Sequence, residues 1–106
     1  MKDSAEGSGK NREAILTLLQ SHREDIRRFG VRRLSLFGSA ARGEAGGASD
    51  LDFVVELEKK TFDAYMDLKA YLEDLFGREV DLVLADAIKP RLRPHIMAEA
   101  VDVPGL

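Results

Sequence analysis

Two short stretches decide the fold: residues 37–44 read FGSAARGE and residues 49–55 read SDLDFVV. The first stretch follows the apolar run of a predicted strand, so Gly38 falls where that strand must turn. Because glycine has no Cβ, Gly38 can adopt a positive φ and let the backbone approach a ligand closely. Residues 40–44 can open a short helix, whose unpaired N–H groups attract phosphate oxygens. The stretch predicts a phosphate cradle around Gly38 and Ser39.

The second stretch places two carboxylates close together. Asp50 and Asp52 are two residues apart, so a strand directs both to one face and Leu51 and Phe53 to the other. Two carboxylates on one face repel unless a cation lies between them, and ligands that are all oxygen suit Mg²⁺. A solvated strand face would also alternate acids with apolar residues. It would not explain why the acids directly follow a loop rich in serine and glycine, so we interpret them as metal ligands.

A third acid, Asp81, lies in the short apolar stretch VDLVL at residues 80–84. Taken alone, an acid near the start of a strand is as consistent with solvent exposure as with function. Glu79 and Asp86 flank the same strand and are the other acids that could serve here. A phosphate cradle together with three strand acids predicts a metal-dependent nucleotide site.

The two stretches together resemble the signature of the polymerase-β-type nucleotidyltransferases. The short chain is similar to the minimal nucleotidyltransferases, the MntA-like antitoxins that are paired with HEPN toxins. The resemblance covers residues 12–103. It implies an α+β fold in which a small mixed sheet carries helices mainly on one face, in the order α-β-α-β-α-β-α. It also implies a third carboxylate on the strand after the long helix, which is Asp81 here.

The resemblance implies transfer of AMP from ATP to a tyrosine hydroxyl of a cognate HEPN toxin, with two Mg²⁺ ions. Asp50 and Asp52 would hold one ion on the triphosphate and, with Asp81, a second ion near the attacking oxygen. Asp81 would accept the hydroxyl proton, while Gly38 and Ser39 would hold the β- and γ-phosphates. Two alternatives are an antitoxin that acts by binding alone and a transferase for a small molecule. The intact set of three acids counts against the first, and the missing second domain against the second.

Two groups of positively charged residues could each serve more than one role. Arg42 could contact the triphosphate or the partner, or it could pair with Glu44 or Asp50 and only stiffen the loop. A basic cluster before the last predicted helix could contact nucleotide or partner, or be a solvated segment; it comprises Lys89, Arg91, Arg93 and His95.

Apolar spacing and turn residues predict the remaining elements. Helices are expected at residues 14–29, 61–76 and 95–100, and strands at 31–37, 51–56 and 80–84. His22 lies on the apolar stripe of the first helix, which favours packing over metal binding. Thr61 is a candidate N-cap and Gly77 a candidate helix end. We expect a flexible arm at residues 1–11 and one domain at residues 12–106.

Composition narrows the function further. The chain has 106 residues, a net charge of −3 and no cysteine, and its pI is near 5.4. An acidic chain lacks the positive surface that non-specific nucleic-acid binding needs. Without cysteine it has neither disulfides nor Cys-based zinc sites. It has no stretch of about 20 apolar residues to span a membrane and no signal-peptide pattern, so we expect a cytoplasmic protein. A single domain leaves the acceptor to be presented by another protein.

Overall fold

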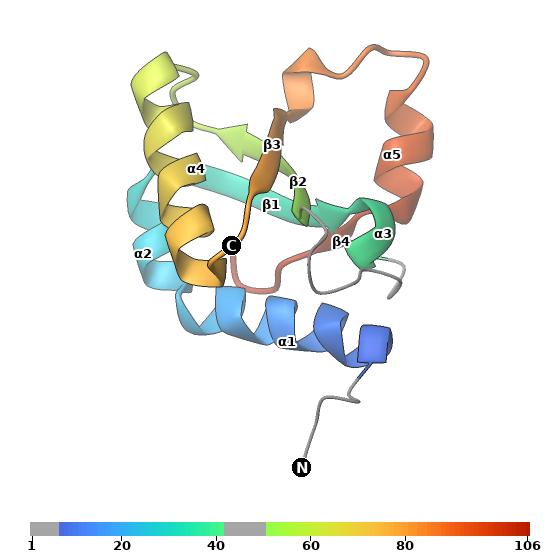
Figure 1. Cartoon of the computed structure of the whole chain (residues 1–106). Helices are drawn as coiled ribbons and strands as arrows, with labels where there is room; N and C mark the ends of the chain where they lie inside the picture. Colours follow the sequence, from blue (N-terminus) through green and yellow to red (C-terminus); the bar gives the residue numbers. More distant parts are fainter. Residues whose placement is uncertain (1–6, 42–50) are drawn as a thin grey trace.

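The structure is a computed structural model that describes residues 7–41 and 51–106. Its centre is a four-stranded sheet with the strand order β3-β2-β1-β4 (Figure 1). The strands are β1 (Val31–Phe37), β2 (Leu51–Leu57), β3 (Val80–Leu84) and β4 (Val101–Asp102). β1 is antiparallel to both β2 and β4, whereas β2 and β3 are parallel. The sheet is therefore mixed, as expected.

Three helices cover one face of this sheet: α1 (Gly7–Ser21), α2 (Arg23–Arg28) and α4 (Phe62–Phe76) (Figure 1). Alternate residues of β2 point into this layer, which is why its apolar positions follow a period of two. The fully buried side chains of the main core come from the helices and from the sheet: Leu19, Ile26, Leu34, Leu36, Leu51, Phe53, Val55, Leu68 and Leu72. Burial of these residues against one another fixes which face of each strand meets the three helices.

The second face carries a smaller apolar cluster. Val54 of β2 is buried there with Ala85 of the 3₁₀ helix η2 (Ala85–Ala87) and with Ile88. Half-buried residues from β1, β3 and α5 (Arg93–Glu99) pack against them, namely Phe37, Val83, Ile96 and Met97. The expected α+β fold with helices mainly on one face is confirmed, and α5 is the helix on the other face.

Local signals place α4 correctly. The Thr61 Oγ1 accepts a hydrogen bond of 3.1 Å from the Ala64 N–H, which caps the helix start. Gly77 ends the helix with a φ of 65° and donates its N–H to the Glu73 carbonyl.

The N-terminal part differs from the prediction in two respects. The helix expected at residues 14–29 is divided at His22, whose ring Nδ1 lies 2.9 Å from the Leu18 carbonyl oxygen and so shares that acceptor with the backbone. α1 begins at Gly7, so residues 7–11 of the expected arm are helical. Extending an existing helix adds one hydrogen bond per residue without a new nucleation cost, which lets it enter a segment of poor helix formers.

The C-terminal part adds an element that the sequence did not indicate. The last helix spans Arg93–Glu99, close to the predicted 95–100, and the two-residue strand β4 follows it. A strand this short has too few side chains for a periodicity signal. Within residues 7–41 and 51–106, no helix is long and apolar enough to cross a membrane.

Candidate functional site

The turn after β1 forms one side of the site. β1 ends at Phe37, and the short helix α3 (Gly38–Ala41) begins at once. Gly38 has a φ of 77°, a conformation that residues with a Cβ rarely adopt. A Cβ placed on Gly38 would lie 3.3 Å from the Cβ and 3.2 Å from the Cγ of Asp52, and closer still to its Oδ2. Glycine is therefore required twice, for the turn and for the Asp52 carboxylate that lies against it.

Asp52 and Asp81 occupy neighbouring positions on the two parallel strands. Asp52 pairs with Phe37 of β1 on one side and with Asp81 of β3 on the other. Adjacent strands are about 4.8 Å apart, and residues in register point to the same face. Asp52 is half-buried and Asp81 is exposed. The fold thus brings Gly38, Asp52 and Asp81 together at one end of the sheet.

Side chains of α4 hold the strand that carries Asp81. β3 is an edge strand, so alternate residues direct backbone groups away from the sheet. The Tyr65 hydroxyl donates to the Leu82 carbonyl at 2.6 Å, and the Val80 N–H donates to Glu73 Oε2 at 3.1 Å. One outward group of Val80 and one of Leu82, the residues on either side of Asp81, are therefore paired with α4, which helps to hold the backbone of β3 in place.

Two hydrogen bonds stabilise the negative charge of Glu73. Lys69 Nζ donates to Glu73 Oε2 at 2.7 Å. This bond, and next the bond from the Val80 N–H, lower the pKa of Glu73 below its ordinary value. Glu73 is consequently ionised near neutral pH, when it is the stronger acceptor for the backbone of β3.

An apolar cluster on the sheet face and a hydrogen bond from α1 also support the site. Phe37, Val54 and Val83 belong to the second apolar cluster and lie on the sheet face that carries the two acids. Arg12 Nη1 donates to the Ala41 carbonyl at 3.0 Å and so ties α1 to the end of α3. The Asp52 side chain thus stands between a packed apolar floor and a tethered turn.

Several predicted site residues lie outside the part of the chain that the structure describes. Asp50 and Arg42 fall within residues 42–50, and the side chain of Ser39 is likewise not described. Across residues 7–41 and 51–106, no three carboxylate or imidazole groups converge on one point. Asp52 and Asp81 are the described residues that could share a divalent cation, and Asp50 is the acid that the sequence places beside them.

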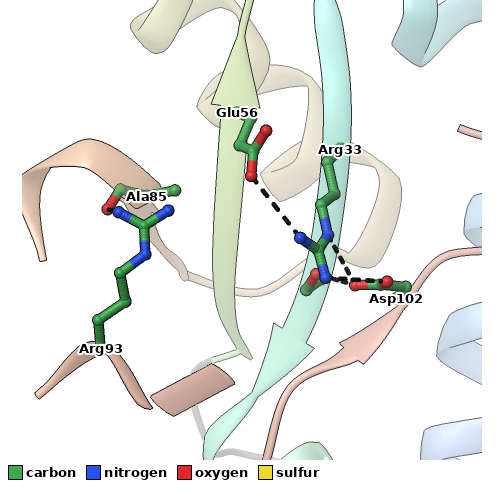
Figure 2. A network of polar contacts seen from close by, with 6 residues as sticks. Arg33, Glu56, Ala85, Arg93 and Asp102 are labelled. Atoms are coloured by element: carbon green, nitrogen blue, oxygen red, sulfur yellow. Dashed lines mark hydrogen bonds and ion pairs between the residues drawn. The ribbon is translucent and has the colours of Figure 1, made fainter. Parts of the chain in front are cut away.

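The basic cluster divides in the structure. Arg93 Nη1 donates to the Ala85 carbonyl at 3.4 Å, so it contacts the backbone after β3 (Figure 2). Lys89, Arg91 and His95 are exposed, as a solvated segment would be. Neither alternative for these three residues is decided by their exposure, so a nucleotide or partner contact stays a prediction.

Sequence analysis did not identify the residues that support the site. Tyr65 falls at an apolar position of its helix, so its hydroxyl carries no separate signal in the sequence. Arg12 and Glu73 look like ordinary surface charges in the sequence, because their partners are backbone groups that only the folded chain brings near. The contact between Gly38 and Asp52 has a weak signal in the sequence, since a glycine after a strand often marks a close approach.

Comparison with known proteins agrees with this geometry. The nucleotidyltransferase domain family matches residues 19–103. The protein adenylyltransferase MntA of Thermococcus cleftensis is 39% identical over 93 residues, which cover 86% of this chain and 94% of that protein. A solved structure of a proposed minimal nucleotidyltransferase is 41% identical with a TM-score of 0.69, covering 81% of this chain and 93% of the other.

A more distant structure shows the same fold. It is a complex of a tri-AMPylated Shewanella oneidensis HEPN toxin with an MNT antitoxin, and the matched chain is 19% identical with a TM-score of 0.61. The match covers 86% of this chain and 73% of the other. The family match spans most of the sequence and includes Gly38, Asp52 and Asp81. This chain belongs to the nucleotidyltransferase domain family.

Proposed function

We propose that this nucleotidyltransferase transfers AMP from ATP to a tyrosine hydroxyl of a cognate HEPN toxin, and thereby acts as an antitoxin. The observation that carries the proposal is the meeting of Gly38, Asp52 and Asp81 at one end of the sheet. The turn supplies backbone N–H groups for phosphate oxygens, and the two acids supply carboxylates beside it. A site with these groups is suited to the triphosphate of a nucleotide and to the oxygen that attacks it.

The donor atoms at this end fit Mg²⁺. Asp52 and Asp81 offer carboxylate oxygens on adjacent strands, and these are the hard ligands that Mg²⁺ prefers. Asp50 would complete the set in the family's two-ion arrangement. When bound, Mg²⁺ would neutralise charge on the triphosphate and on the leaving pyrophosphate.

The transfer itself requires little covalent chemistry from the chain. Asp81 would take the proton from the acceptor hydroxyl, whose oxygen forms a bond to the α-phosphorus. The bond between the α-phosphorus and the bridging oxygen breaks, and pyrophosphate leaves with that electron pair. Asp81 is the more exposed of the two described acids, which suits contact with an incoming acceptor. Most of the acceleration would come from positioning and from charge stabilisation.

The acceptor is proposed from the relatives, from the exposure of Asp81 and from the charge of the chain. The MntA protein of Thermococcus cleftensis is named a protein adenylyltransferase, and its similarity covers nearly the whole of both chains. The Shewanella oneidensis neighbour is bound to a HEPN toxin that carries AMP. Asp81 is exposed at this end of the sheet, where a folded partner would present its tyrosine. An acidic net charge makes nucleic acid a poor acceptor.

Coexpression tests the proposal. The chain is produced together with the protein encoded by the neighbouring gene, and the partner is weighed by intact-mass spectrometry. We expect a mass gain of one or more AMP units with the wild-type chain and none with Asp52→Asn. Asp67→Asn is the matched control, because Asp67 is an exposed acid on α4 and should leave the gain unchanged.

The same experiment separates catalysis from neutralisation by binding. If Asp50→Asn/Asp52→Asn still protects cells while the partner stays unmodified, the antitoxin acts by binding. An unmodified partner in the presence of the wild-type chain would refute the proposed reaction with this acceptor.

A further inference from the structure

α5 is packed loosely for an element so close to the acids. It has seven residues, and none of them is fully buried. Ile96 and Met97 reach the apolar cluster that includes Phe37 and Val83, on the sheet face of Asp52 and Asp81. A helix this short is not stable by itself in water. Its position on this sheet face therefore depends on the packing of Ile96 and Met97 and on the contacts at its two ends.

The N-terminal end of α5 is tied to η2 through Arg93, whose positive charge also acts on Asp86. Arg93 Nη1 reaches back to the Ala85 carbonyl, at 3.4 Å, as Figure 2 shows. This distance is near the limit for a hydrogen bond, and Arg93 is exposed, so the contact is weak.

The C-terminal end is held through β4. Only Ala100 separates α5 from this strand. β4 pairs with β1 at two positions, Ser35 with Asp102 and Leu36 with Val101. The ladder is short, although the Val103 N–H continues it with a hydrogen bond of 2.9 Å to the Leu34 carbonyl, and Val103 itself is buried. The side chain of Asp102 adds further contacts between β4 and β1.

Asp102 gathers three donors from β1 (Figure 2). Arg33 donates from Nε to Oδ1 and from Nη2 to Oδ2, both at 3.1 Å. Ser35, whose side chain is 1% exposed, donates its hydroxyl to Oδ1. Glu56 lies 3.8 Å from Arg33 Nη1 on the opposite side of the guanidinium. Arg33 is thereby fixed between two carboxylates and presents its planar fork to Asp102.

These contacts should contribute more to stability than a single ion pair at the surface does. Asp102 is about half exposed, and a single exposed pair contributes little to stability. The two-point geometry with Arg33 is stronger, because both hydrogen bonds are charge-assisted. Removal of Asp102 would also leave the buried Ser35 hydroxyl without its acceptor, and such a loss is costly.

We propose that Asp102 is a positioning residue for the transfer reaction: through Arg33 and Ser35 it helps to hold β4 on β1 and thereby keeps α5 packed on the sheet face that carries Asp52 and Asp81. The effect on AMP transfer rests on the proposed function, whereas the role of Asp102 in holding α5 rests on the contacts alone.

Three variants test it. Asp102→Ala removes every acceptor, whereas Asp102→Asn keeps an acceptor for Ser35 and loses the charge. Arg28→Ala is the matched control, since it breaks an exposed pair of 3.2 Å with Asp25 on α2, away from β4. In hydrogen exchange without nucleotide, Asp102→Ala should speed exchange in residues 93–99 by about tenfold relative to wild type. Asp102→Asn should give an exchange rate between those of wild type and Asp102→Ala. The exchange rate of α4 should not change in any variant, and Arg28→Ala should exchange like wild type.

Kinetics supply the second measurement. Asp102→Ala should lower kcat for AMP transfer by about tenfold, because small misplacements of a reacting geometry are costly. The affinity for a non-hydrolysable ATP analogue should stay within about twofold, since the turn at Gly38 is held separately by Arg12. Unchanged exchange in α5, an equal rise of exchange in α4, or an unchanged kcat in an active enzyme would overturn the inference. A wild-type chain without transfer activity would instead contradict the proposed function, and the exchange data would still decide whether Asp102 holds α5.

Discussion

Gly38→Ala is the substitution whose effect the structure defines most closely. The new methyl group would meet Asp52 and would have to exist at a φ of 77°. The closest atoms include the Asp52 Cβ at 3.3 Å, which cannot rotate away because the backbone of β2 fixes it. The variant must therefore shift either the turn or the start of β2, and both belong to the proposed site.

The magnitude follows from two separate costs. A residue with a Cβ in the left-handed region costs about 1–2 kcal/mol. Overpacking against a fixed neighbour adds about 1–3 kcal/mol. Gly77→Ala is the matched control, because Gly77 has a φ of 65° and no atom within 4 Å of the added Cβ. It should pay the first cost alone, so Gly38→Ala should lower the free energy of unfolding by about 1–3 kcal/mol more than Gly77→Ala.

Urea unfolding of both variants gives the stability difference, and thermal unfolding with and without Mg²⁺ and ATP reports on the site. A ligand that binds only the folded chain raises its melting temperature. Gly77→Ala should keep that rise, and Gly38→Ala should lose most of it. In the Asp52→Ala background, the extra cost of Gly38→Ala should shrink, because the carboxylate contacts are gone. Equal stability losses and equal ligand responses in the two glycine variants would refute the reasoning.

Three further predictions concern the residues around the acids. Asp81→Asn should reduce turnover far more than it reduces affinity for an ATP analogue, as calorimetric titration would show; an equal loss in both would make Asp81 chiefly a ligand. Tyr65→Phe removes a hydroxyl that pairs an outward carbonyl of β3 and should cost about 1 kcal/mol in urea unfolding, with no cost contradicting the contact. Hydrogen bonds from Lys69 and the Val80 N–H lower the pKa of Glu73 in the folded chain. Ionised Glu73 therefore stabilises the fold at pH values above the ordinary pKa of a glutamate. This stabilisation is lost as the pH falls through the lower pKa of the folded chain. The difference in unfolding free energy between wild type and Glu73→Gln should therefore narrow as the pH falls below the ordinary pKa of a glutamate, and a constant difference would refute this.

Much of the fold could be predicted because its signals are local. The cap at Thr61 and the glycine at Gly77 delimit α4 in the sequence as they do in the structure. The strands β1 and β3 occupy the predicted residues, and β2 extends one residue further. Their apolar runs and adjoining turns suffice for this.

The site could be predicted only in part. Gly38, Asp52 and Asp81 come together because strand ends meet at one end of a sheet, and the family resemblance supplied which strands are neighbours. Strand order and direction are not encoded in periodicity, so the side-by-side register of Asp52 with Asp81 could not be derived from the residues alone.

The supporting contacts could not be predicted at all. Arg33 and Ser35 meet Asp102 across 69 and 67 residues of chain. Nothing in the local sequence distinguishes Arg33 and Ser35 from other polar residues of a strand. Asp102 likewise shows its role only in the folded chain, where Arg33 and Ser35 donate to it.

Transfer of a labelled phosphate tests the central claim most directly. The purified chain is incubated with Mg²⁺, the cognate partner protein and ATP labelled at either the α- or the γ-phosphate. We expect that the α-label becomes attached to the partner, that the γ-label leaves in pyrophosphate, and that Asp52→Asn abolishes both while Asp67→Asn does not. Attachment of the γ-label, or α-label transfer that survives Asp52→Asn, would contradict this claim.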